Sequence, residues 1–166
     1  MNKKQKLTKG MEHESLNPRE ALEGALSLYS AEPDYGSLEV LMKAMLYSMF
    51  KKMTVYTAIL GEDIPDNPAA IPNGATYKGF DIRSLDLQDG TCAVVALTNQ
   101  ELLKNVPPTP FLEVALDELM AYASEMNVDG LLLNPGPDNY YFPMEMVKGF
   151  LEQWEMAKKL LNKRRK

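Results

Sequence analysis

Two short runs of the chain are almost purely apolar, and they constrain the fold more than any other feature. The first run is 92–97 (CAVVAL) and the second is 131–133 (LLL). A strand that is apolar on both faces has to be covered on both faces, as in the interior of a sheet that lies between helices. We therefore expect an α+β fold in a single domain, with a mixed sheet of about five strands flanked by helices.

The remaining patterns predict the order of elements along the chain. Helical periodicity and helix-start residues indicate helices near 17–29, 38–50, 98–105, 111–126 and 143–161. Strand-like composition indicates strands near 53–60, 80–87, 91–97, 128–134 and 139–142. The polar residues 1–16 are expected to form a disordered arm. Residues 17–157 are then the domain, and residues 158–166 are a basic helix end or tail.

Three local motifs make sharper predictions. Asn17 precedes a proline and is expected to cap the first helix. The pair Asp89-Gly90 lies between two strand-like segments and is expected to form a type I′ hairpin turn. Thr98 is followed three residues later by Glu101, which is the spacing of a capping box. We expect that box to begin the short helix near 98–105.

Charge and composition restrict the classes of function. The net charge is −5 and the isoelectric point is about 5.0, which argues against a general nucleic-acid binder. Cys92 is the single cysteine, so no internal disulfide can form and a reducing compartment is favoured. No apolar run approaches the roughly 20 residues that span a bilayer, and no apolar segment follows the basic residues 1–10. We expect a cytoplasmic protein without a membrane segment.

The chain ends in a basic run, 158–166 (KKLLNKRRK), which contains six basic residues and no acidic one. The favoured interpretation is a solvated helix end, because cations are stabilised near the negative end of the helix dipole. The alternative is a contact with an anionic partner.

Methionines recur at helical spacing in the second expected helix. Met42, Met45 and Met49 fall along one face of that helix, and Met53 follows it. Core packing is the favoured interpretation, because methionine fills irregular gaps. The alternative is an adaptable apolar groove for a partner.

The residue types of common catalytic sites are sparse. His13 is the single histidine and lies in the expected arm, without a second histidine at metal-binding spacing. Cys92 lies within an expected buried strand and is interpreted as a structural thiol. Neither a GxGxxG motif nor a Walker-type phosphate loop is present. We therefore expect no catalytic residues, no bound metal and no cofactor.

Two carboxylate pairs have spacings that can divide acid and base roles if burial separates their pKa values. Glu113 and Asp117 lie four residues apart on the expected 111–126 helix, and Asp86 and Asp89 flank the expected hairpin turn. Both pairs are interpreted as solvated charges, because they fall on faces expected to be exposed.

The segment 134–140 (NPGPDNY) combines two prolines with other turn-forming residues directly after an apolar strand. The favoured interpretation is a structural chain reversal. The alternative is a contact surface made by Asn134, Asp138 and Tyr140, because ligands often bind at the carboxyl edge of an α/β sheet.

Three segments together resemble the N-terminal domain of the SseB family, which is named for enhanced serine sensitivity in bacteria. They are 53–60 (MTVYTAIL) with the two helices before it, 92–102 (CAVVALTNQEL), and 128–147 (VDGLLLNPGPDNYYFPMEMV). The matching positions are Thr98, Glu101, Asp129, Gly130, Asn134 and Pro135. The resemblance covers roughly residues 17–155, departs from the family at Leu97, and leaves the 61–79 loop unmatched. It implies a single α/β or α+β domain of unknown or accessory function, with no established catalytic residues.

The sequence therefore favours a non-enzymatic interaction or accessory domain, with another protein as its partner and neither a specific nucleic acid nor a membrane. The alternative is a small-ligand-binding protein, or an enzyme with a carboxylate-based site under the 61–79 loop. That loop is rich in proline and glycine, and loops of such length are often functional.

Overall fold

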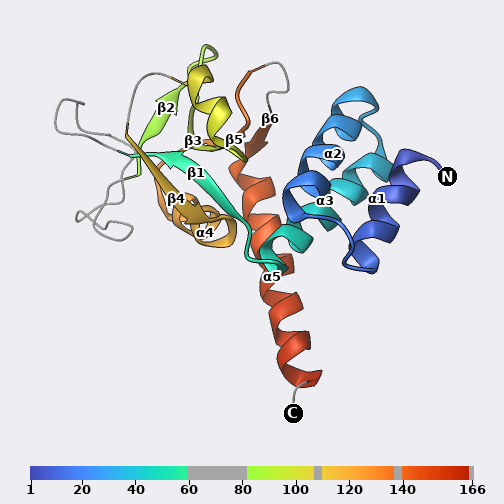
Figure 1. Cartoon of the computed structure of the whole chain (residues 1–166). Helices are drawn as coiled ribbons and strands as arrows, with labels where there is room; N and C mark the ends of the chain where they lie inside the picture. The colour runs from blue at the N-terminus through green and yellow to red at the C-terminus, as the bar shows by residue number, and fades with distance from the viewer. Residues whose placement is uncertain (60–81, 107–109, 137–139, 165–166) are drawn as a thin grey trace. The chain divides into compact units, whose positions relative to one another are not determined.

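The computed structural model describes residues 1–59, 82–106, 110–136 and 140–164 (Figure 1). Its internal contacts divide the chain into two compact units. The helical unit contains Met1–Met53 and Gly149–Lys166, and the sheet unit contains Thr54–Lys148. Helices and strands confirm the α+β class. The expected division into 1–16, 17–157 and 158–166 does not coincide with these units, because part of the C-terminal helix groups with the N-terminal helices.

Helix α1 (Lys3–Glu12) begins the helical unit, where the sequence predicted a disordered arm. Its N-cap is Asn2, whose Oδ1 accepts a hydrogen bond of 2.9 Å from the N–H of Gln5. The Gln5 side chain in turn accepts from the N–H of Asn2 at 3.1 Å, which completes a capping box. Met11 is buried. The prediction of disorder was wrong because polar composition hides this cap and the apolar contact at the end of the helix.

Helices α2 (Pro18–Ala31) and α3 (Tyr35–Phe50) complete a cluster in which all three helices pack against one another (Figure 1). The predicted N-cap of α2 is confirmed, because Asn17 Oδ1 accepts from a backbone N–H at 2.8 Å. Asp34 caps α3 through the N–H of Ser37, and the Ser37 hydroxyl accepts from the N–H of Asp34. Both helix starts therefore follow from local residues.

The methionine face of α3 is part of the core of the helical unit. Met45 and Met49 are fully buried, Met53 is buried after the helix, and Met42 is half-buried. Packing was the favoured interpretation of these residues, and the structure confirms it.

The described strands of the sheet unit are β1 (Thr54–Ala58), β2 (Ser84–Asp86), β3 (Cys92–Ala96), β4 (Phe111–Ala115), β5 (Gly130–Leu133) and β6 (Tyr140–Pro143). They form two sheets, an antiparallel β1-β4 pair and a mixed sheet of order β2-β3-β5-β6. In the mixed sheet β3 and β5 are parallel, and both are almost entirely buried as predicted. The expectation of one sheet of about five strands was wrong.

Two isolated bridges link the segments of the two sheets, and one of them joins Ile59 to Ile82, where the N–H of Arg83 also donates to Ala58 O at 2.9 Å. The other bridge joins Tyr56 to Leu97. The N–H of each residue donates to the carbonyl oxygen of the other, at 2.9 and 2.8 Å. β2 occupies this edge of β3 as far as Val94, so β1 reaches the edge only beyond the end of β2. The competition of β1 and β2 for one edge explains why the sheet divides.

The predicted hairpin joins β2 and β3, but its turn is not of type I′. A type I′ turn needs positive φ at both central residues, and of the pair Asp89-Gly90 only Gly90 has a positive φ, at 88°. The N–H of Gly90 donates to Leu87 O at 3.1 Å, and the N–H of Leu87 donates to Thr91 O at 2.8 Å. This is the pattern of a three-residue loop that ends in a left-handed glycine. The Asp89 carboxylate accepts from the N–H and the hydroxyl of Thr91. Asp86 and Asp89 are both exposed, in agreement with their interpretation as solvated charges.

The helix predicted over 111–126 is shorter, because its first residues form β4 and only α4 (Leu116–Glu125) is helical. Val114 is buried in the antiparallel pairing with β1, and valine and phenylalanine suit a strand. Backbone pairing with β1 thus overrides the helical period. Glu113 and Asp117 lie in different elements and are not one turn apart on a helix.

The predicted capping box at Thr98 is also wrong. The short 3-10 helix η2 (Gln100–Asn105) has Asn99 as its N-cap, and no side chain makes the capping bond. Thr98 instead pairs with Asn134, and Glu101 lies exposed in the first turn of η2. A long-range side-chain pair therefore replaces the local one.

Helix α5 (Met144–Arg164) ends the described chain, and from Gly149 onward it belongs to the helical unit. The described part of the basic segment, 158–164, continues α5 as a helix, with Lys163 and Arg164 in its last turn. Among the described residues, no helix is both long and apolar enough to cross a membrane.

Candidate functional site

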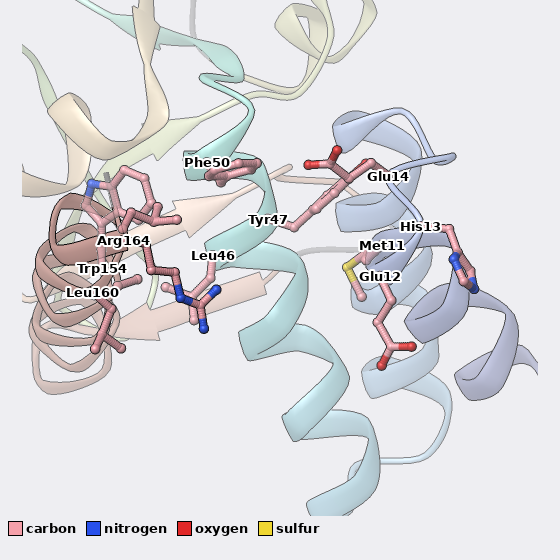
Figure 2. A pocket seen from close by; sticks show the side chains of 12 residues that line it. Met11, Glu12, His13, Glu14, Leu46, Tyr47, Phe50, Trp154, Leu160 and Arg164 are labelled. Atoms are coloured by element: carbon pink, nitrogen blue, oxygen red, sulfur yellow. The ribbon is translucent and has the colours of Figure 1, made fainter. Parts of the chain in front are cut away.

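An apolar groove of about 500 Å³ lies within the helical unit, between the ends of α1 and α3 and the C-terminal half of α5. Figure 2 shows the side chains that line it and the helices that carry them. The lining residues are Met11, Glu12, His13, Glu14, Leu46, Tyr47, Phe50, Trp154, Ala157, Leu160, Leu161 and Arg164. Its volume is in the range of sites that bind small molecules or a few side chains of a partner.

The wall formed by α1 and α3 is held in place by polar contacts. The Tyr47 hydroxyl donates to the carbonyl oxygen of Leu16 at 2.6 Å. Lys51 Nζ lies 3.3 Å from a carboxylate oxygen of Glu14, and it also lies 5.8 Å from the centre of the Tyr47 ring. A cation close to an aromatic ring is attracted by the electrons of the ring. The aromatic side of this wall is therefore fixed before any partner binds.

The wall formed by α5 centres on Trp154, which is 9% exposed. Its indole Nε1 is buried and has no hydrogen-bond partner within the described part of the chain. Lys158 Nζ lies 5.6 Å from the centre of the indole ring and 2.7 Å from a carboxylate oxygen of Glu155. Buried polar groups without a partner are uncommon in proteins, and here the unpaired indole N–H lies inside the wall and not on its solvent-exposed face.

The apolar rim of the groove is open to solvent. Phe50 is 44% exposed and Leu160 is 60% exposed, whereas most side chains of their type are buried. The groove thus holds its aromatic side chains in place and exposes large apolar side chains at its rim. Such a surface favours the binding of another apolar surface.

A second groove, of about 690 Å³, lies between α1 and α2. Its rim carries Lys3, Lys4 and Lys6, and its floor includes Leu7 and Leu28. Lys4 is paired with a carboxylate of the helical unit. This groove lies away from α5 and lacks aromatic residues among the described residues of its lining.

The sequence-predicted residue Asn134 follows β5 and is bonded to Thr98, which follows β3. The N–H of Thr98 donates to Asn134 Oδ1 at 2.9 Å, and Asn134 Nδ2 donates to Thr98 Oγ1 at 3.0 Å. Asn134 has a φ of 50°, a left-handed conformation that asparagine adopts more readily than most residues. The pair joins the carboxyl ends of the two parallel strands.

Asp129 and Gly130 stand at the opposite ends of the same strands. Asp129 Oδ2 accepts from the N–H of Cys92 at 2.9 Å, and the carbonyl oxygen of Asp129 accepts from the N–H of Met144. A β-carbon at Gly130 would collide with the carbonyl oxygen of Phe142. Structural contacts thus account for the carboxylate of Asp129 and for the lack of a side chain at Gly130.

The structure describes two of the three residues of the predicted contact surface, Asn134 and Tyr140. Asp138 lies outside the described residues, and Tyr140 is 9% exposed. Pro135 is buried and Asn134 is half-buried. The contact surface stays a prediction, and the described contacts of Asn134 are those of a chain reversal.

Cys92 is half-buried rather than buried. Burial raises the pKa of its thiol, and the nearby Asp129 carboxylate adds to this increase. A higher pKa lowers the fraction of reactive thiolate at neutral pH. Among the described residues, no group of three or more His, Cys, Asp or Glu side chains can hold a metal ion.

Sequence reasoning missed the groove beside α5, although it predicted the last helix near 143–161. The missing information was α1, because the segment that carries Met11 and His13 was expected to be disordered. The capping pair Asn2 and Gln5 was the available signal.

Comparisons with protein-family models, with curated proteins and with solved structures found no match.

Proposed function

We propose that this chain is a non-enzymatic, cytoplasmic interaction domain that binds an apolar helix of a protein partner in the groove beside α5. The observation that carries the proposal is a rim with Phe50 at 44% and Leu160 at 60% exposure around a cavity of about 500 Å³. Amphipathic helices bind grooves of this kind through apolar residues at helical spacing.

The chemistry of the lining supports a protein partner. Aromatic residues are enriched at the centres of protein interfaces, and this lining contains Tyr47, Phe50 and Trp154. The charged residues stand among apolar ones, with Glu12 and Glu14 at the end of α1 and Arg164 at the end of α5. Such an apolar centre with charges around it favours binding of a helix whose exposed face is polar.

Membership of the SseB family is part of the same proposal. Its support is the sequence motif together with the contacts of Thr98, Asp129, Gly130 and Asn134, which tie the ends of β3, β5 and β6. The other interpretation of the sequence, a ligand or carboxylate-based site under the 61–79 loop, lies outside the described residues.

The test is affinity capture with purified tagged chain, in which the groove variant Phe50→Lys is compared with the native protein. We expect the native protein to retain specific proteins and the variant to lose them, because a charge at the rim opposes burial of an apolar helix. The matched control is Tyr35→Lys, since Tyr35 is 92% exposed on the same helix but does not line the groove.

Circular dichroism spectra first establish that both variants fold. Equal capture by the native protein and Phe50→Lys would contradict the proposal. So would an equal loss with Tyr35→Lys, because the loss would then not depend on the groove.

A further inference from the structure

The C-terminal half of α5 carries an exposed apolar pair outside the core of the helical unit. Met156 is 58% exposed and Leu160 is 60% exposed, one helical turn apart. Successive residues of a helix are about 100° apart. Glu152, Met156, Leu160 and Lys163 therefore fall within an arc of roughly 80°. We call this surface of four residues the α5 stripe.

Charge changes sign along the α5 stripe. Glu152 precedes the apolar pair and Lys163 follows it, and both side chains are exposed. Within the described part of the chain neither residue forms a salt bridge, whereas Lys158 on the same helix is paired with Glu155. The stripe thus has an acidic end, an apolar centre and a basic end.

A surface with this order of charges is complementary to its own copy. When two such stripes meet antiparallel about a two-fold axis, the acidic end of each faces the basic end of the other, and the apolar pairs meet at the centre. A parallel arrangement would place like charges opposite each other. For two copies of this chain, the order of charges therefore favours the antiparallel orientation over the parallel one.

We propose that the α5 stripe binds a second copy of this chain, in an antiparallel pairing of the two α5 helices about an axis near residue 158. Glu152 of each copy faces Lys163 of the other, and the Met156 and Leu160 side chains pack between them. Leu160 also lines the groove. The pairing therefore rests on the proposed function, and a second copy of the chain is the protein partner. The second copy supplies the apolar helix that covers this rim.

The same charges also suit the dipole of α5 itself, since acidic residues are stabilised near the start of a helix and basic residues near its end. The two explanations predict different results when two charge variants of the chain are mixed. A dipole effect acts within one chain, whereas the pairing makes the association of two different charge variants stronger than the self-association of either.

The experiment is sedimentation velocity of the full chain over a series of concentrations. We expect the native protein to form a dimer, and Met156→Lys to remain a monomer. Glu152→Lys and Lys163→Glu each place two like-charge pairs in the interface, so each should raise the dissociation constant about tenfold. An equimolar mixture of these two variants should associate as tightly as the native protein. Glu125→Lys, a reversal on the exposed end of α4, should have no effect.

A native protein that stays monomeric overturns the inference, and so does a mixture that associates no better than its components. If the native protein is monomeric while capture still depends on Phe50, the groove binds a different protein and only the pairing fails. If the dimer forms but Phe50→Lys changes neither capture nor association, the proposed function of the groove fails instead.

Discussion

Replacement of Asn134 by alanine should destabilise the sheet unit, because this side chain joins the ends of β3 and β5. Thr98 is fully buried, and its N–H donates to Asn134 Oδ1 at 2.9 Å. In the alanine variant that N–H loses its acceptor, which costs about 1–3 kcal/mol. Alanine at a φ of 50° adds about 1 kcal/mol of backbone strain. The expected decrease in the free energy of unfolding is roughly 2–4 kcal/mol.

Two further substitutions at this position separate the two contributions. Asn134→Gly removes the hydrogen bonds without the backbone strain, and it should be about 1 kcal/mol more stable than Asn134→Ala. Asn134→Asp keeps an acceptor for the N–H of Thr98 and should show the smallest decrease in the free energy of unfolding. Asn127→Ala is the control, because Asn127 is exposed and surface changes are usually within about 0.5 kcal/mol.

The assay is denaturant unfolding followed by circular dichroism, together with hydrogen exchange at the Thr98 amide. Exchange reports the sheet unit directly if the two units unfold separately. A free energy of unfolding of Asn134→Ala within about 0.5 kcal/mol of the native value, with the Thr98 amide still protected, would show that this side chain does not stabilise the sheet unit. Equal stability of the alanine and glycine variants would remove the strain contribution alone.

Gly130→Ala should lower the free energy of unfolding by about 2 kcal/mol or more, because the added methyl group collides with a strand backbone. Gly149→Ala has open space and should raise it by about 0.5–1 kcal/mol, so equal effects in thermal unfolding would contradict this pair. The N–H of Ser37, and then Lys4, hold the pKa of Asp34 below its ordinary value of 3.8. The stabilising effect of the Asp34 carboxylate is present above that value and is lost as the pH falls through the folded pKa. The free energies of unfolding of the native protein and of Asp34→Asn should therefore converge at acid pH. A difference in stability that persists at the lowest pH would count against the pKa assignment. Truncation after Leu161 should cost less than about 2 kcal/mol, because α5 has only exposed described residues beyond it, and a larger loss in thermal unfolding would show that the tail is packed.

Short-range sequence patterns correctly predicted the elements whose conformation does not depend on distant parts of the chain. The runs of β3 and β5 are apolar on both faces, so burial alone determines that they lie inside the sheet. Asn17 acts as the N-cap of α2 because its acceptor and the orphan N–H are two residues apart. In these cases the deciding interaction lies within a few residues of the motif.

The wrong predictions share a different cause, which is competition between local and long-range partners. Thr98 has the spacing of a capping box but bonds to Asn134, far away in the sequence. Residues 111–115 continue a helical period yet pair with β1, and that pairing forms only once the chain has folded. The groove depends on α1, α3 and α5 together, so no single segment of the sequence reveals it.

The most direct test of the interaction surface is a photo-crosslinking amino acid in place of Leu160, which lies both on the rim of the groove and on the α5 stripe. After irradiation of the purified protein, we expect an adduct of twice the chain mass, with the crosslink on α5 of the second copy near Met156. The same label in place of Tyr35 should give no such adduct. An irradiated sample in which Leu160 and Tyr35 labels give the same products, or in which the crosslink falls outside α5, would contradict the account.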